Sequence, residues 1–147
     1  MDALDRKILN IMQKNSRITV KQIAEECFIS SPSVSVRLQN LESLGYIRTY
    51  QAVLDHQKLG FLIKAYVNCA VNAKDKQDFY RYIEEIPNVV ECDCITGDYS
   101  ILFKVYFTNT IELDEFINDL QRFGDTKTHI VFSTNVGPRG LQIQVNE

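Results

Sequence analysis

Residues 29–47, ISSPSVSVRLQNLESLGYI, decide the fold of the first half of the chain. Ser30 is a strong helix cap, and Pro32 fits a helix only in its first turn, so a helix begins here. Gly45 is typical of a helix end. Apolar residues recur between these limits at helical spacing and mark one buried face: Val34, Leu38 and Leu41.

Two further helices are predicted upstream of this stretch. Residues 4–12 carry an apolar stripe of helical period, with Asp2 as a candidate cap. Thr19 and Gln22 form a capping box that opens a second, short helix. The order of helix, short helix, tight turn and longer helix predicts a helix-turn-helix unit. Residues 47–54 are rich in β formers and could add a strand or wing.

The second half, after a hinge at residues 55–60, alternates strands with helices. Apolar residues in alternation predict four strands, at residues 63–71, 90–94, 101–107 and 128–134, and helical spacing predicts helices over 79–86 and 113–120. The order βαββαβ is the ferredoxin-like arrangement. We therefore expect an α+β protein, with a winged helix-turn-helix domain at about 1–60 and a ferredoxin-like domain at about 61–147.

Composition limits the possible functions. With 147 residues, 45% hydrophobic and 24% charged, the chain is an ordinary globular protein, and it lacks the long apolar run of a membrane span. We expect a cytoplasmic protein, with Cys27, Cys69, Cys92 and Cys94 as buried thiols. Residues 1–60 hold eight Lys and Arg against six Asp and Glu, net +2, whereas residues 61–147 hold eight against thirteen, net −5. The two halves should therefore meet different partners.

The outer face of the helix in residues 31–44 is a candidate DNA-binding surface. It is small and polar, as a recognition helix in the major groove requires. The candidate residues are Ser33, Val36, Arg37 and Asn40 on the outer side, with Ser31, Pro32 and Ser35 at or near its N-terminal end. The same residues could be an ordinary solvated helix face. With one arginine per helix, tight binding should need more than one copy of the chain.

The second half offers a candidate ligand site and a candidate subunit interface. The turn Gly97-Asp98-Tyr99-Ser100 can present free backbone amides to a carboxylate, and Tyr99 supplies an apolar wall with a hydroxyl. Thr128 and Ser133 could add hydrogen bonds. Residues 101–107 carry large apolar side chains on both faces, and two helices can cover only one face of a sheet, so we expect the other face to meet a second subunit.

Catalytic signatures are missing from the sequence, and we expect no enzyme, cofactor or metal. His56 and His129 are isolated, and no serine nucleophile motif, phosphate loop or zinc signature occurs. Cys92 and Cys94 point to one face of a strand and could bind a soft metal or sense an oxidant. Small residues packed under the helices are the favoured interpretation of this pair.

Taken in order, these residues resemble the leucine-responsive and asparagine-synthesis regulators, the Lrp/AsnC family. The resemblance lies in residues 29–47, in LDRKIL at 4–9, in Leu59-Gly60 at the hinge and in Gly97-Asp98-Tyr99, and covers essentially the whole chain. It implies a DNA-binding transcriptional regulator with a recognition helix at about Ser31 to Leu44. It also implies a dimer, often assembled into an octamer, that binds an amino acid or related small molecule between dimers.

The family resemblance also places Arg37 near a phosphate or a base edge. The family loop usually continues with a second aspartate, where this chain has Ser100, so a different effector is one expectation. Two alternatives share the architecture: a haem-pathway decarboxylase of the sirohaem type, which needs a histidine such as His129, and a ligand-sensing assembly protein without DNA binding.

Overall fold

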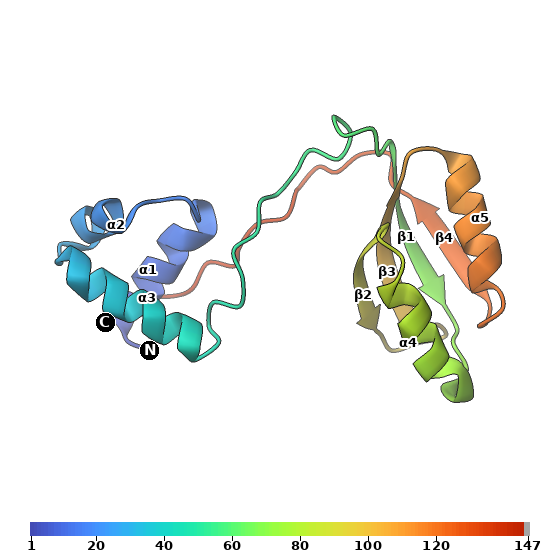
Figure 1. Ribbon diagram of the computed structural model, residues 1–147, viewed down its shortest axis with the longest axis horizontal. Helices are drawn as coiled ribbons and strands as arrows, with labels where there is room; N and C mark the ends of the chain where they lie inside the picture. Colours follow the sequence, from blue (N-terminus) through green and yellow to red (C-terminus); the bar gives the residue numbers. More distant parts are fainter. Residues whose placement is uncertain (146–147) are drawn as a thin grey trace. The chain divides into compact units, whose positions relative to one another are not determined.

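The computed structural model describes residues 1–145 of the chain. These form two compact units (Figure 1). One unit joins residues 1–53 to the tail that starts at Val136, and the other comprises Leu54–Asn135. The expected boundary at residue 60 differs from this division in two ways: the hinge belongs to the second unit, and the tail packs with the first.

Three helices form the first unit: α1 (Ala3–Lys14), α2 (Val20–Cys27) and α3 (Ser31–Ser43). Their N-terminal caps follow the sequence prediction. Asp2 and Asp5 form a capping box on α1, Thr19 and Gln22 form one on α2, and the Ser30 hydroxyl accepts from the backbone N–H of Ser33. Side chains from all three helices make one core, which consists of Ile8, Leu9, Ile23, Ala24, Cys27, Val34 and Leu41.

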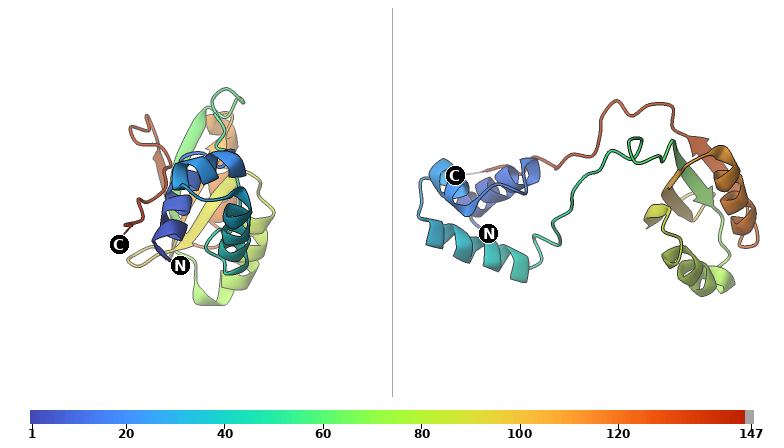
Figure 2. Two further views of the ribbon diagram at one scale, coloured as in Figure 1. Left: turned by 90° about the vertical axis from the view of Figure 1, so that its left-hand side faces the viewer. Right: turned by 45° about the horizontal axis from the view of Figure 1, so that its top comes forward.

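The C-terminal tail lies against α1, a contact that the sequence did not predict (Figure 2). Asn10 donates to the carbonyl of Ile143 at 2.7 Å and accepts from its N–H at 2.9 Å. Gln13 donates to the carbonyl of Leu141, and the Ile143 side chain packs on the helical core. The alternating tail residues thus bind to a helix through side-chain amides and do not form a strand.

A four-stranded antiparallel sheet forms the second unit, with strand order β2-β3-β1-β4. Its elements in chain order are β1 (Ile63–Cys69), a short 3-10 helix (Ala73–Asp75), α4 (Lys76–Glu84), β2 (Val89–Cys94), β3 (Ile101–Phe107), α5 (Thr110–Leu120) and β4 (Thr126–Ile130). This is the ferredoxin-like arrangement that the sequence predicted. The last strand ends four residues before the predicted limit of 134.

Both helices of this unit cover one face of the sheet. Their buried side chains, among them Phe79, Ile83, Phe116 and Leu120, pack on Val67, Phe103 and other inward residues of β1 and β3. The opposite face carries Tyr66, Leu102, Lys104 and Tyr106, all half-buried, so it mixes aromatic, apolar and charged groups.

The strand or wing expected at residues 47–54 is not formed in the structure of the single chain. No strand within residues 1–145 pairs with these residues, so their backbone groups gain no ladder hydrogen bonds. Among the described helices, none combines the length and the apolar character needed to cross a membrane.

Candidate functional site

The recognition-helix candidate, α3, is held at both ends by backbone geometry. Pro32 lies in its first turn behind the Ser30 cap. At its C-terminal end Gly45 has a φ of +75°, a conformation that glycine adopts without strain. The N–H of Tyr46 bonds to the carbonyl of Leu41, and the N–H of Gly45 bonds to that of Glu42, which is the Schellman motif.

The exposed face of α3 differs in part from the predicted one. Of the predicted residues, Pro32, Val36 and Asn40 are exposed, whereas Ser31, Ser33, Ser35 and Arg37 are half-buried. The Ser35 hydroxyl donates to the carbonyl of Ser31, one turn back. Gln39 and Ser43 are exposed on the same face and were missed, although helical spacing from Val36 would have found them.

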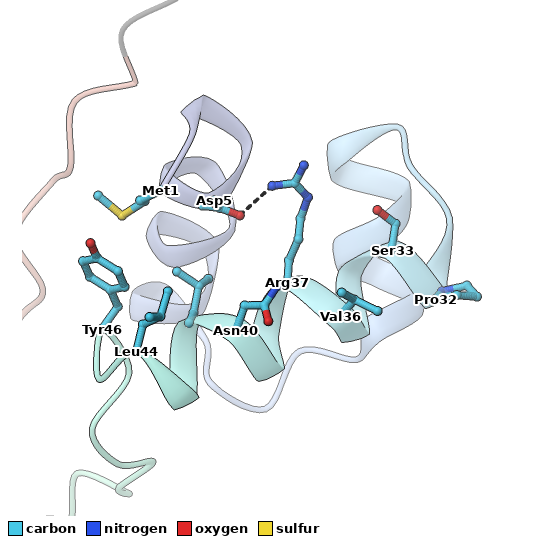
Figure 3. Close-up of a pocket in the computed structure, with 10 residues that line it drawn as sticks. Met1, Asp5, Pro32, Ser33, Val36, Arg37, Asn40, Leu44 and Tyr46 are labelled. Atoms are coloured by element: carbon cyan, nitrogen blue, oxygen red, sulfur yellow. Dashed lines mark hydrogen bonds and ion pairs between the residues drawn. The ribbon is translucent and has the colours of Figure 1, made fainter.

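A phosphate-binding arginine would extend into solvent, but the Arg37 side chain is half-buried. Its Nη1 donates to Oδ2 of Asp2 at 2.7 Å. The same Nη1 donates to Oδ1 of Asp5 at 2.6 Å (Figure 3). The hydrogen bonds to Asp2 and Asp5 raise the pKa of Arg37. The pKa of Asp2 is lowered by the backbone N–H of Asp5 and then by Arg37. Two carboxylates thus face one guanidinium, and the group carries a net negative charge.

A hollow of about 620 Å³ lies along α3 beside this ion pair (Figure 3). Its apolar wall includes Met1, Val36, Leu44 and Tyr46, and its polar groups are those of Asp5, Ser33, Arg37 and Asn40. Val36, Leu44 and Tyr46 are each more than half exposed. The surface of α3 around this hollow is therefore apolar except for groups such as the Asn40 amide, and the one cation of α3, Arg37, is already paired.

In the second unit, the predicted ligand turn joins β2 to β3. Gly97 has a φ of +109°, Asp98 is exposed and Tyr99 is half-buried. The Ser100 hydroxyl accepts from the N–H of Val71 at 3.2 Å and is 3.4 Å from its carbonyl oxygen. Ser100 therefore ties the turn to the end of β1, which gives this departure from the family pattern a structural role.

Thr128 and Ser133 do not join this turn within one chain. Thr128 lies on β4, where it pairs with Val67 of β1. Because β1 stands between β4 and β3, these two strands are two strand spacings apart, roughly 10 Å. Ser133 follows β4 at the end of the sheet where Ile63 pairs with Phe107. The turn lies at the other end, where Cys69 pairs with Ile101.

The remaining candidates for chemistry are two histidines and two cysteines of the second unit. The His56 ring stacks on Tyr106 with centroids 3.9 Å apart, and His129 is exposed on β4 opposite Tyr66. Cys92 packs under the helices as predicted, but Cys94 is exposed. Within residues 1–145 there is no cluster of three or more His, Cys, Asp or Glu side chains arranged to hold a metal ion.

Both halves of the chain match models of known protein families. Residues 1–48 match the model of winged helix-turn-helix DNA-binding domains, and residues 64–140 match that of the Lrp/AsnC ligand binding domain. The chain is 31% identical over 133 residues to the HTH-type transcriptional regulator LrpC of Bacillus subtilis, covering 90% of this chain and 92% of that protein.

Solved structures agree with this match. The structure of B. subtilis LrpC superposes with a TM-score of 0.88 at 30% identity, covering 94% of this chain and 99% of that one. A transcriptional regulator from Neisseria meningitidis, in complex with L-methionine, gives 0.89 at 25% identity, covering 99% and 97%. The two domain matches and the extent of the likeness to LrpC show that this chain belongs to the Lrp/AsnC family of transcriptional regulators.

Proposed function

We propose that the chain binds double-stranded DNA through α3 and regulates transcription in response to an amino acid or a related small molecule. The observation that carries the DNA-binding part is the exposed, uncluttered face of α3, held by caps at both ends. A helix with short side chains brings its backbone close to base edges in the major groove. A regulator of this kind acts on the chromosome, so we place it in the cytoplasm and give it no catalytic role.

A dimer is the functional form that the sheet favours. α4 and α5 leave one face of the sheet uncovered, and Leu102, Tyr66 and Tyr106 on that face are side chains that subunit interfaces commonly bury. Two copies double the contacts with DNA and require a roughly palindromic operator. Light scattering at micromolar concentration tests this proposal, because a dimer should have twice the mass of the single chain. A mass equal to that of four dimers would indicate an octamer.

For the effector, the strongest support is the turn at Gly97–Ser100. Tyr99 is half-buried beside backbone that glycine keeps in a left-handed conformation, and the matched domain is described as ligand binding. The Neisseria relative was solved with L-methionine. Because Thr128 and Ser133 lie elsewhere in the chain, they would contribute only if a second copy brought them to the turn.

DNA recovered from the protein's own genome provides the test of DNA binding. The purified full chain should retain a small set of duplexes, and Val36→Glu, which adds an anion to the exposed face of α3, should abolish retention. Asn118→Glu adds the same charge to an exposed position of α5 and is the matched control. Equal retention by the wild type and the Val36 variant would remove α3 from the interface.

Thermal unfolding in the presence of each amino acid tests the effector. A ligand at 100 times its dissociation constant that binds only the folded state adds about 2.7 kcal/mol of stability. At least one amino acid should raise the melting temperature, and Tyr99→Ala should remove the rise. Should no amino acid act at millimolar concentration, the effector proposal fails while DNA binding stands.

A further inference from the structure

The charged groups of α3 are both engaged within the chain. The helix carries one cation and one anion, Arg37 and Glu42. Arg37 is held by Asp2 and Asp5, and Oε1 of Glu42 accepts a hydrogen bond from the Tyr50 hydroxyl at 2.6 Å. Neither side chain is free to reach a base unless an internal contact is broken.

This engagement removes the usual readers of G·C pairs. Guanine is read mainly by an arginine or lysine that donates two hydrogen bonds to its O6 and N7 atoms, and cytosine by a carboxylate that accepts from its N4 amine. Nη1 of Arg37 already bridges two carboxylates, and its Nε is buried without a partner among the described residues. A two-pronged contact with guanine is therefore blocked.

The side chains that stay free are those that read A·T pairs. Val36, Gln39 and Asn40 are exposed at helical spacing on one face, whereas the hydroxyl of Ser43 on the same face donates to the backbone carbonyl of Asn40. Within residues 1–145 the side-chain amides of Gln39 and Asn40 make no hydrogen bond, so their donors and acceptors are available. An amide pairs with N6 and N7 of adenine, and the valine methyls match the methyl group of thymine.

We propose that α3 reads A·T base pairs directly, with Gln39 and Asn40 on adenine and Val36 on a thymine methyl, and that Arg37 takes no part in base recognition. This inference rests on the proposed DNA binding through α3.

Selection from a random duplex library with the purified full chain provides the first test. The positions contacted by α3 should be A·T, and replacing one of them by G·C should weaken binding about tenfold. Asn40→Arg and Gln39→Arg should each change the preferred base at one position to guanine. Arg37→Lys should leave the selected sequence unchanged. Asn118→Arg adds the same charge on α5 and should alter no base preference.

Base analogues separate direct reading from a preference for the shape of A·T-rich DNA. Replacing adenine by 7-deazaadenine removes the N7 acceptor, and replacing thymine by deoxyuridine removes the methyl group. We expect each analogue to weaken wild-type binding. The double variant Gln39→Ala/Asn40→Ala should abolish the effect of 7-deazaadenine, and Val36→Ala should abolish that of deoxyuridine. Selection of G·C at the α3 positions, or insensitivity to both analogues, would overturn the inference. A library from which no duplex is retained would instead refute DNA binding itself.

Discussion

Nη1 of Arg37 lies 2.6 Å from Oδ1 of Asp5, and this contact joins the middle of α3 to the first turn of α1. The side chains are 27% and 16% exposed, so water screens the pair only in part. Asp5 also belongs to the capping box that starts α1. Arg37, which the sequence suggested as a DNA contact, therefore links α3 to α1 through an ion pair.

Arg37→Ala should lower the stability of the helical unit. Hydrogen bonds between charged groups contribute roughly 1.5–3 kcal/mol, and partial exposure favours the lower end, so we expect a loss of about 1–2 kcal/mol in the free energy of unfolding. Chemical denaturation measures it. Arg48→Ala, at an exposed arginine of the same unit, should change stability little. If both variants have the same free energy of unfolding, the ion pairs of Arg37 do not stabilise the unit.

Asp2→Asn should strengthen DNA binding. Asparagine caps helices as well as aspartate does, so α1 should persist, while one of the two carboxylates that hold Arg37 loses its charge. A released Arg37 that meets a phosphate should steepen the dependence of log K on log salt by about 0.9. Binding titrations across salt test this, with Glu115→Gln on α5 as the control for net charge. A parallel salt dependence in all three proteins would show that Arg37 stays bound to α1.

Local sequence signals predicted the helix limits because caps act over three or four residues. Asp2 with Asp5, Thr19 with Gln22, and Ser30 before Pro32 each set a helix start that the structure confirms. The Arg37 contact spans 32 residues and depends on where the α1 terminus lies, so helical spacing alone placed Arg37 on the outer face. The contact between Asn10 and Ile143 spans 133 residues and has no local signal at all.

Strand predictions in the second unit succeeded because a half-buried sheet imposes a period of two. The buried residues of β3, Ile101 to Phe107 in alternation, follow that period throughout. Which side chains gather at one site depends instead on strand order and direction. Ser133 could have added a hydrogen bond beside Tyr99 only if the two lay close together, and antiparallel pairing puts them at opposite ends of the sheet.

Gly124→Ala should destabilise the second unit. A Cβ at this position would lie 2.0 Å from the carbonyl oxygen of Ala70 and 2.8 Å from its carbon, and backbone atoms can yield only by shifting β1. Overpacking of this kind costs roughly 1–3 kcal/mol. Gly137→Ala, where the added Cβ meets open space, should be close to neutral. Equal melting temperatures for the two variants would contradict the close approach.

The rate of thiol modification should distinguish the exposed Cys94 from the buried Cys69. Cys94 is exposed, whereas Cys69 is fully buried and its burial raises the pKa of the thiol to about 11. A disulfide reagent at pH 8 should therefore modify Cys94 rapidly and Cys69 only after unfolding. Cys94→Ser should remove the fast phase, and Cys69→Ser should leave it unchanged. A fast phase that survives Cys94→Ser would mean that another thiol is accessible.

Tyr50 should make the first unit sensitive to high pH. Burial of the half-exposed ring, followed by the hydrogen bond to Glu42, raises the pKa of Tyr50 from 10.0 to about 12. Between these values the unfolded chain has lost the phenolic proton that the folded chain still holds, so folding becomes less favourable as pH rises. The stabilisation is complete below pH 10 and disappears as pH passes 12.

Tyr50→Phe isolates this contribution, because phenylalanine has no proton to lose and makes no bond to Glu42. Below pH 10 the wild type should be the more stable protein, and its advantage should shrink as pH rises toward 12. Denaturant titrations of both proteins at pH 8, 10 and 11 measure the difference directly. Other tyrosines titrate in both proteins and cancel in the comparison. A difference that stays constant with pH would mean that the Tyr50 hydroxyl does not bond to Glu42, and that Glu42 is free to contact a base.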